Sequence, residues 1–388
     1  MVGIGVIGYG GRIADLLDKV PGIGTEINVM ALCDPSQQSR SRCKKSFGEI
    51  AIYDDYKQLV NDPSIEWVII GSWNCFHRDH VLAAIEAGKH VFCEKPLGIT
   101  IDECIDIKQT VMNSNSKFAI GFVLRFSPHY LKIKSLIDSG SIGKIISMEF
   151  NETIHFNHGG YIFGDWRRLR KNAGTHILEK CCHDVDLVNW LVGSRACRIA
   201  SFGGRNFFKP ENDYHIARIA KDEKGLDAYR TWPGTISLNP FTSDKDIFDN
   251  QVAIIEYENG VRTTFHTNCN AGIPERRMYI LGTEGAIRAD VLSGKIELQR
   301  IGHCEPCVDE SSQSSGGHGG ADHLLAKQIS DAIVNDITLS PGIDEAVDSA
   351  VTCFGIDQAA DSGCVVDMNP IWQNLYKQCT IKKTLNAL

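Results

Sequence analysis

The chain has 388 residues and a formal net charge of −8, with 43% hydrophobic and 23% charged residues. This length allows two domains with cores of their own, and the composition is that of a globular protein. The negative charge argues against nucleic acid or an anionic membrane as the main partner, and no apolar run is long enough to span a bilayer.

The N-terminal segment has no basic region and runs directly into a glycine turn, which argues against a signal peptide. Fourteen cysteines in such a chain indicate reduced thiols. We therefore expect a cytoplasmic protein.

Short apolar runs alternate with amphipathic stretches over the first 124 residues. This alternation predicts βαβ units and a doubly wound parallel sheet. The expected strands are 5–7, 27–33, 67–71, 90–93 and 118–121. We assign 1–124 to a dinucleotide-binding domain.

From residue 125 the pattern becomes α+β, and we assign 125–388 to a domain for substrate binding and oligomerisation. The Glu258-Asn259-Gly260 turn predicts an antiparallel hairpin within a large open sheet. Helices are expected at 127–139 and from about 175 to 192. Further strands are expected at 145–153, 251–257, 261–268, 277–282, 286–291 and 295–300, and a Ser/Gly-rich loop at 311–320.

The first strand ends in Gly8-Tyr9-Gly10-Gly11-Arg12-Ile13, a glycine turn that opens a helix. Gly8 and Gly10 allow a tight turn and a close approach to a pyrophosphate, which the helix N-terminus would bind. The third position of the fingerprint is Ile13 instead of Gly or Ala, which weakens the motif.

The second strand ends at Asp34, at about the expected separation from the glycines. A carboxylate there can bind the adenosine ribose hydroxyls and repel a 2′-phosphate, so NAD is predicted. Arg40 and Arg42 follow and leave NADP open as the less favoured cofactor. The alternative is that Asp34-Pro35-Ser36 is only a turn.

Lys95 follows the apolar run 90–93 and precedes Pro96, at the carboxyl edge of the predicted sheet, where open α/β folds bind ligands. Glu179, His183 and Asp186 fall within roughly a 60° stripe of a core helix. A histidine facing a lysine would suit proton transfer, with the lysine stabilising alkoxide charge. A buried structural network is the alternative for the helix.

Together these motifs resemble the glucose–fructose oxidoreductase, inositol dehydrogenase and rhizopine-catabolism (Gfo/Idh/MocA) family. The resemblance rests on the glycine turn, on Cys33-Asp34-Pro35, and on Asn74 with His77. It continues with 87–97, which includes Glu94-Lys95-Pro96, with the Glu179/His183/Asp186 helix, and with 282–285.

The resemblance implies a Rossmann domain, a bound nicotinamide cofactor, and an open C-terminal sheet that joins copies into a homodimer or homotetramer. Lys95 and His183 match the family's catalytic lysine and histidine, and Glu179 stands where an aspartate is usual. Trp73 stands where proline is frequent. The expected cofactor-binding residues are Gly8, Tyr9, Gly10, Gly11, Arg12, Ile13, Asp34, Ser72, Trp73, Asn74, His77, Glu94, Lys95 and Arg125.

Two loop regions add candidate substrate residues. His158, Trp166 and Arg167 suit a sugar site, where aromatic faces cover C–H groups and polar groups bind hydroxyls. His318 and Asp322 open a helix after the Ser/Gly-rich loop and could close over a substrate. The expected substrate-binding residues are Lys95, His158, Trp166, Arg167, Glu179, His183, Asp186, His318 and Asp322.

The sequence thus predicts an NAD-dependent oxidoreductase that transfers hydride between the nicotinamide and a secondary alcohol of a sugar, sugar derivative or cyclitol. One alternative is an NAD-assisted glycoside hydrolase that oxidises its sugar transiently. Another is a non-catalytic NAD-binding regulator, against which the presence of Lys95 counts. No metal site is predicted, since Cys304 and Cys307 provide only half of a zinc-site spacing.

Overall fold

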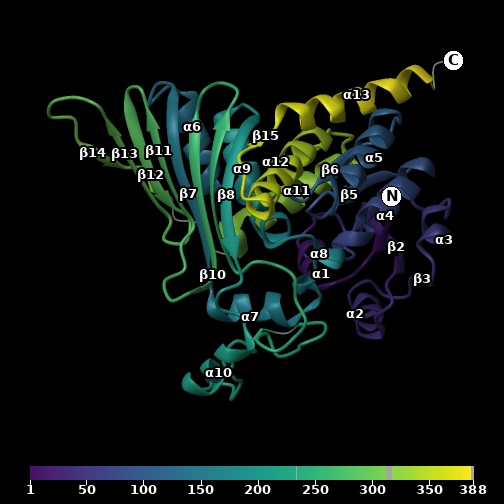
Figure 1. Ribbon diagram of the computed structural model, residues 1–388. Coiled ribbons are helices and arrows are strands. Elements are labelled where there is room, and N and C mark those ends of the chain that lie inside the picture. Colours follow the sequence, from purple (N-terminus) through teal and green to yellow (C-terminus); the bar gives the residue numbers. More distant parts are fainter. Residues whose placement is uncertain (233, 312–316, 386–388) are drawn as a thin grey trace. The chain divides into compact units, whose positions relative to one another are not determined.

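The computed structural model describes the chain except residues 233, 312–316 and 386–388 (Figure 1). The chain forms two compact units. The first contains Met1–Ser127, Ser315–Ala350 and Trp372–Leu388, and the second contains Pro128–Ser314 and Val351–Ile371. The first break, after Ser127, lies close to the predicted boundary near residue 125. The assignment of all of 125–388 to one domain differs from this division, because C-terminal segments return to the first unit.

Within the described residues, the first unit contains a six-stranded sheet in the order β3-β2-β1-β4-β5-β6, and its strand pairs are all parallel. The strand order reverses between β1 and β4, which makes the carboxyl ends of these strands the ligand-binding edge. The predicted doubly wound sheet is confirmed. Its strands are β1 (Val2–Ile7), β2 (Ile27–Cys33), β3 (Ala51–Tyr53), β4 (Trp67–Ile70), β5 (His90–Cys93) and β6 (Phe118–Ile120).

Helices connect these strands, and α2 (Gln37–Phe47), α3 (Tyr56–Val60) and α5 (Ile101–Met112) begin at a side-chain cap, which for α3 is Asp55. Ser36 accepts a hydrogen bond from Ser39 N, and Thr100 accepts one from Glu103 N, as N-cap residues do. The other connecting helices are α1 (Gly11–Leu17) and α4 (His77–Glu86). The later helix α11 (Ala321–Val334) contacts α1, which explains why this segment belongs to the first unit.

The second unit contains, in the described part of the chain, a nine-stranded sheet in the order β14-β13-β12-β11-β7-β10-β9-β8-β15. Strands β7 and β10 pair in parallel and the other pairs are antiparallel. The predicted open, mostly antiparallel sheet is confirmed. Its strands are β7 (Ile145–His155), β8 (Ala196–Gly204), β9 (Asn250–Tyr257), β10 (Arg262–Ala271), β11 (Arg277–Gly282), β12 (Gly285–Asp290), β13 (Lys295–Arg300), β14 (Cys307–Asp309) and β15 (Val366–Asp367).

Helices α6 (Pro128–Asp138) and α9 (Cys182–Val192) of the second unit lie against one face of this sheet, and α7 (Phe156–Gly164) and α10 (Tyr214–Arg218) lie at its lower end in the view of Figure 1. Helix α9 contacts β7, and α6 contacts α9. Helix α8 (Arg170–Ala173) also belongs to this region. The chain passes between units within α12 (Ile343–Ser362) and α13 (Asn369–Leu385). Among the described residues, no helix has both the length and the apolar character needed to cross a membrane.

Candidate functional site

The glycine turn after β1 leaves backbone exposed where a pyrophosphate would lie. Gly8 has φ +83°, and a Cβ there would lie 2.5 Å from Ser72 N. Both the left-handed backbone conformation and the lack of space for a side chain therefore require glycine at this position. Gly10 is the N-cap of α1, and a Cβ on it would meet no atom within 4 Å. The turn is therefore tight on its β4 side and open at the helix N-terminus, as a dinucleotide site needs.

The unusual Ile13 in the fingerprint is accommodated by Gly71. A Cβ on Gly71 would lie 2.0 Å from Cγ1 of Ile13, and Ile13 itself is fully buried. In the usual fingerprint, the third glycine lets the helix pack closely against the sheet. Here Gly71, which follows β4, provides the space that the Ile13 side chain fills. The departure at Ile13 thus does not disrupt the turn.

Asp34 is fixed beside this turn by two backbone donors. Tyr9 N donates to its Oδ2 at 2.7 Å, and Ser36 N donates to its Oδ1 at 2.7 Å. The Tyr9 ring is buried against Phe47, so this predicted cofactor residue offers only its backbone to a ligand. The buried Asp34 carboxylate thus lies directly beside the glycine turn of the NAD-binding fold.

The two arginines that left NADP open also lie at this turn. Arg40 Nε donates to the Asp34 carbonyl oxygen at 2.6 Å, and Arg40 pairs with Asp54. Arg42 donates to the Tyr9 carbonyl oxygen, and its guanidinium lies 5.1 Å from the Tyr9 ring centroid. Both guanidiniums therefore already bind protein groups.

His77 connects the loop after β4 with the segment that carries Lys95. Its Nδ1 lies 2.7 Å from the Pro96 carbonyl oxygen, and its Nε2 lies 3.2 Å from the Ser72 carbonyl oxygen. Burial lowers the pKa of His77, so the ring is neutral near pH 7. The predicted residues Ser72 and Trp73 lie in the loop after β4, and Asn74 begins a short 3-10 helix (Asn74–Phe76). His77 holds this segment next to Lys95-Pro96.

Arg12 brings together two predicted residues from distant parts of the sequence. Its Nε lies 2.9 Å from Oε1 of Glu94, and its Nη1 lies 2.5 Å from Oδ1 of Asp322. Asp322, expected as a substrate residue, is thus an ion-pair partner at the start of α11 in the first unit. Arg125 lies 3.8 Å from Glu345 in the same unit. The backbone of His318 is in a short 3-10 turn (Gly317–Gly320), and its side chain lies outside the described residues.

In the second unit, Glu179 lies in a π-helical turn (Ile177–Cys181) that precedes α9. The expected α-helix from about 175 therefore begins differently, and a uniform 100° per residue does not describe the path from Glu179 to His183. Glu179 Oε1 accepts a hydrogen bond from Arg167 Nε at 3.0 Å, and Arg167 also pairs with Asp165 at 3.2 Å. His183 and Asp186 are buried on α9.

A buried charge network lies next to this helix, and it is formed by residues that the sequence did not single out. Arg276 binds both carboxylate oxygens of Asp184 at 2.7 Å and lies 3.2 Å from Glu152, which lies 3.2 Å from Lys180. Burial raises the pKa of Asp184 against the opposing charge of Arg276. Glu152 and Arg276 come from β7 and the approach to β11, and their spacing in the sequence gave no signal of the pairing.

Of the remaining predicted substrate residues, Trp166 is buried and lies under the Arg167 guanidinium at 4.3 Å from its ring centroid. His158 stacks on Trp232 with ring centroids 4.4 Å apart. Burial, with the nearby Lys180 ammonium, lowers the pKa of His158 to about 3. Trp232 was not singled out from the sequence, because it lies in the long segment between β8 and β9.

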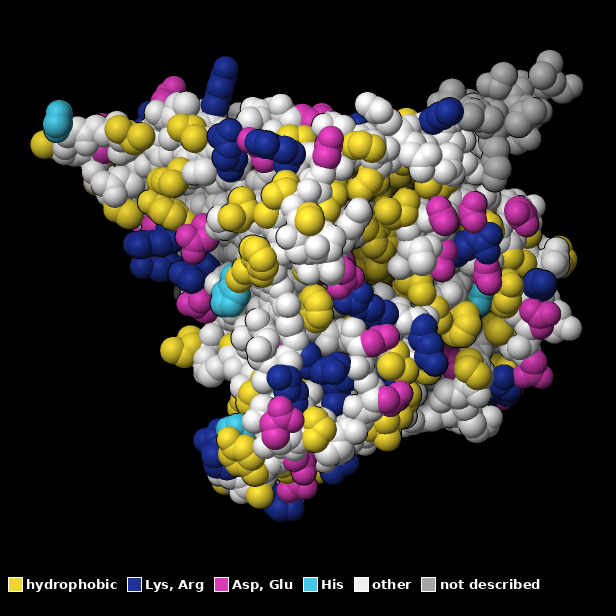
Figure 2. All heavy atoms as spheres, in the orientation of Figure 1, with side chains coloured by type: hydrophobic (Ala, Val, Ile, Leu, Met, Phe, Trp, Pro, Cys, Tyr) yellow, Lys and Arg dark blue, Asp and Glu magenta, His cyan; other side chains and the backbone are white. Residues whose placement is uncertain are grey.

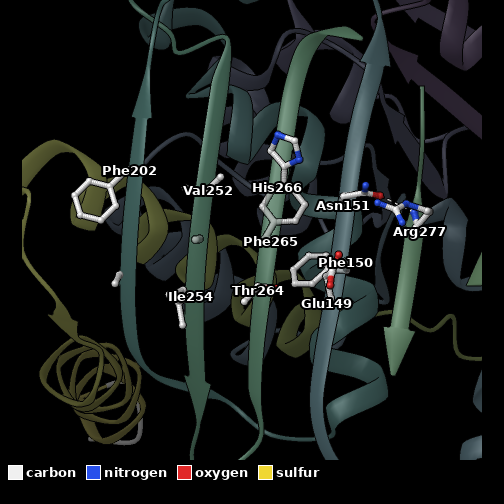
Figure 3. A pocket seen from close by; sticks show the side chains of 12 residues that line it. Glu149, Phe150, Asn151, Phe202, Val252, Ile254, Thr264, Phe265, His266 and Arg277 are labelled. Atoms are coloured by element: carbon white, nitrogen blue, oxygen red, sulfur yellow. Dashed lines mark hydrogen bonds between the residues drawn. The ribbon is translucent and has the colours of Figure 1, made fainter. Parts of the chain in front are cut away.

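A separate hollow of about 320 Å³ lies on the sheet of the second unit (Figure 3). Side chains from β7, β8, β9, β10 and β11 line it, and Phe202, Val252 and Ile254 are the apolar ones that are most exposed. None of the predicted catalytic residues lines it. Within the described ranges, no group of three or more His, Cys, Asp and Glu side chains is placed to hold a metal ion.

Two family models match most of the chain. The model described as an oxidoreductase family with an NAD-binding Rossmann fold matches residues 2–122, and the GFO/IDH/MocA C-terminal domain matches residues 130–288. The chain therefore belongs to the GFO/IDH/MocA family of oxidoreductases. The predicted family, its Rossmann fold and its NAD-binding domain are confirmed.

Curated relatives are similar over different lengths. A putative oxidoreductase YteT of Bacillus subtilis is 24% identical over 357 residues, which is 79% of this chain and 82% of that protein. An inositol 2-dehydrogenase/D-chiro-inositol 3-dehydrogenase of Lactiplantibacillus plantarum is 29% identical over 238 residues, or 61% of this chain and 63% of the relative. This second match spans less than two thirds of the relative's length.

Solved structures confirm the fold. Levoglucosan dehydrogenase in complex with NADH and levoglucosan aligns with a TM-score of 0.77 at 19% identity, covering 95% of this chain and 99% of the other. A myo-inositol 2-dehydrogenase from Lactobacillus plantarum aligns with a TM-score of 0.70 at 20% identity, covering 94% and 99%. At these identities the likeness concerns the fold alone.

Proposed function

We propose that this protein is an NAD-dependent dehydrogenase acting on a secondary alcohol of a sugar, sugar derivative or cyclitol. The observation that carries the proposal is the turn at Gly8 and Gly10 with Asp34 fixed beside it, in a chain whose first 122 residues match an NAD-binding oxidoreductase model. The names of the relatives, inositol and levoglucosan dehydrogenases, support the substrate class.

His183 takes the proton of the substrate hydroxyl, because an imidazole titrates near neutral pH. Lys95 binds the same oxygen and stabilises the developing alkoxide. NAD, when bound, accepts the hydride from the carbon that carries the hydroxyl. Glu179, held by Arg167, binds a neighbouring hydroxyl and orients the ring. This pairing of Lys95 with His183 rests on the chemistry of the two side chains and on the family resemblance.

The experiment is a panel of sugars, glycosides and inositols, with NAD or NADP, measured as absorbance of the reduced cofactor. Net NADH formation with a free sugar or cyclitol supports the proposal. Glycoside cleavage without net NADH would replace it with the NAD-assisted hydrolase. Binding of NAD without reaction of any substrate would replace it with the regulator.

We also propose that copies of the chain associate through the open face of the C-terminal sheet. Phe202, Val252 and Ile254 are 70%, 47% and 58% exposed on adjacent strands, and Tyr279 and Leu281 of β11 are exposed as well. In Figure 2, hydrophobic side chains are visible on the surface over β7 to β10. Exposed apolar side chains gathered on one sheet face support an interaction surface there. The partner that covers this face is a second copy of the same chain.

A further inference from the structure

Three aromatic rings come together beside the candidate substrate residues of the second unit. Trp232 stacks on His158, with centroids 4.4 Å apart and planes 24° apart, and it lies 5.9 Å from Tyr161. We call His158, Tyr161 and Trp232 the aromatic platform. Trp232 remains 46% exposed. His158 stacks on one face of the indole, and the exposed area of Trp232 is left for a ligand to cover.

Residues on either side of Trp232 in the sequence are hydrogen-bonded to the α7 region. Tyr229 N donates to Oδ1 of Asn157 at 2.7 Å, and Ile236 N donates to Oδ1 of Asp165 at 2.9 Å. Both acceptors flank or belong to α7, which also carries His158. The segment that bears Trp232 is therefore attached to the same helix as the ring on which Trp232 stacks.

The wider segment 205–249 has a core of its own. Phe208, Tyr229, Phe241 and Ile247 are buried together with Phe163 of α7. Asp249 accepts hydrogen bonds from the backbone N atoms of residues 206, 207 and 208 and so closes the base of the segment. The described part of this segment thus has buried residues both before and after Trp232, and a ring anchored on both sides loses less freedom on binding.

The platform continues into the polar candidate site. The Arg167 guanidinium lies 4.9 Å from the Tyr161 ring centroid, and Arg167 Nε binds Glu179 at 3.0 Å. The sequence of contacts runs from Trp232 through Tyr161 and Arg167 to Glu179, one helical turn before His183. Polar groups that can bind hydroxyls thus lie at the Glu179 end of this series of contacts, and the partly exposed indole of Trp232 lies at the other end.

Aromatic side chains bind the C–H faces of sugar rings and the faces of aryl groups, while carboxylate and guanidinium groups bind hydroxyls. A substrate that consists of one small ring held at Glu179 would leave the exposed part of the Trp232 indole in contact with water. We infer that the substrate carries a second ring, glycosyl or aryl, which stacks on Trp232 while the oxidised ring is held at Glu179. This inference rests on the proposed function, because it takes Glu179 and His183 as the site of oxidation.

The test compares the methyl and phenyl glycosides of D-glucose, D-galactose and D-mannose as substrates, with NAD as cofactor, and free sugars and inositols as single-ring references. Trp232→Ala removes the stacking face, and Trp232→Phe keeps a smaller one. Tyr214→Ala is the matched control, because Tyr214 is an exposed aromatic residue of the same segment that stacks on His215. Thermal melting of each variant shows whether the segment remains folded.

An aromatic pair contributes about 0.5–1.5 kcal/mol beyond its buried area, which corresponds to roughly 2- to 10-fold in kcat/KM. We expect the wild type to prefer phenyl over methyl glycosides by this factor. Trp232→Ala should abolish the preference for phenyl glycosides, while Trp232→Phe keeps part of it and Tyr214→Ala keeps all of it. A wild type without the preference, or a preference that survives Trp232→Ala, overturns the inference.

Failure of the proposed function is distinguished by calorimetry. If no hydroxyl compound is oxidised, binding of the same methyl and phenyl glycosides to the NADH-loaded protein is measured by titration. Tighter binding of phenyl glycosides that is lost in Trp232→Ala supports the platform even though the dehydrogenase proposal has failed. Equal binding of both glycosides, or binding of neither, overturns the platform.

Discussion

The Nε atom of Arg167 lies 3.0 Å from Oε1 of Glu179, and this ion pair joins the short 3-10 turn of Trp166–Arg168 to the π-helical turn before α9. Both side chains are largely buried, with exposures of 22% and 10%. A π-helical turn frequently marks a functional site. The pair therefore sets where the Glu179 carboxylate lies, one turn before His183.

Removing Arg167 should lower catalytic efficiency without preventing folding. In Arg167→Ala the Glu179 carboxylate loses its guanidinium partner and turns to other groups, and a displacement of about 1 Å in a positioning group can reduce the rate 10²-fold. We expect kcat/KM to fall by about 10- to 100-fold, with partial recovery in Arg167→Lys. Steady-state kinetics with the best substrate measures this. Arg170→Ala, which removes the more exposed pair with Asp361, is the control. Equal effects of both changes would contradict the role given to Arg167.

Asp34 should determine the preference for NAD. A hydrogen bond to a charged group contributes about 1.5–3 kcal/mol, so Asp34→Ala should raise the KM for NAD by roughly 10- to 100-fold. The same change removes the repulsion of a 2′-phosphate, so the ratio of kcat/KM for NADP to that for NAD should rise. Kinetics with both cofactors measures the ratio. An unchanged cofactor ratio would show that Asp34 is only a turn residue.

His129 on α6 should make the protein sensitive to acid. It is 1% exposed, and among the described residues neither of its ring nitrogens has a hydrogen-bond partner. Burial lowers the pKa of His129 to about 4. Because the unfolded pKa is higher, at about 6.5, the unfolded chain binds more protons, so stability is complete above about pH 6.5 and is lost as the pH falls toward 4.

For this one histidine the loss is about 2 kcal/mol between neutral pH and pH 5. The variant His129→Phe should therefore lose about 2 kcal/mol less than the wild type when urea unfolding is compared at pH 7.5 and pH 5. His323→Phe, at an exposed position of α11, is the control and should match the wild type within about 0.5 kcal/mol. The same pH dependence in His129→Phe and wild type would refute the assignment.

The open sheet face should determine the oligomeric state. Phe202→Lys combined with Ile254→Lys places two charges on that face, and a charge buried without a partner costs several kcal/mol. We expect the double variant to be monomeric by light scattering after gel filtration, while the wild type is a dimer or tetramer. Leu292→Lys, at an exposed apolar residue between β12 and β13, should leave the mass unchanged. A wild-type monomer, or a double variant of unchanged mass, would contradict the proposal.

Much of the fold could be predicted because its strands are short apolar runs with clear turns. Strands β2 and β5 match their expected ranges to the residue, and the Glu258-Asn259-Gly260 turn correctly predicts the pairing of β9 with β10. β3 and β14 were missed because each is three residues long and none of their residues is buried. The return of α11 to the first unit was not predicted, because its contact through Arg12 and Asp322 joins residues that are 310 positions apart in the sequence.

The candidate site was predictable where a local motif carries it. Gly8, Gly10 and Asp34 form the expected turn, and the sequence spacing alone indicated it. The compensation of Ile13 by Gly71 is a tertiary effect that no local spacing reveals. Trp232 was missed for the same reason, since it reaches His158 only through the fold of a long segment between two strands.

The most direct test of the account is the turnover of His183→Ala, measured as NADH formation with the best substrate, together with its affinity for NAD. A positioned general base contributes about 10²–10⁴ in rate. We predict that kcat falls by at least 10²-fold while NAD binds as in the wild type. Turnover within a few-fold of the wild type, with NAD bound, would show that His183 does not take the proton of the substrate hydroxyl.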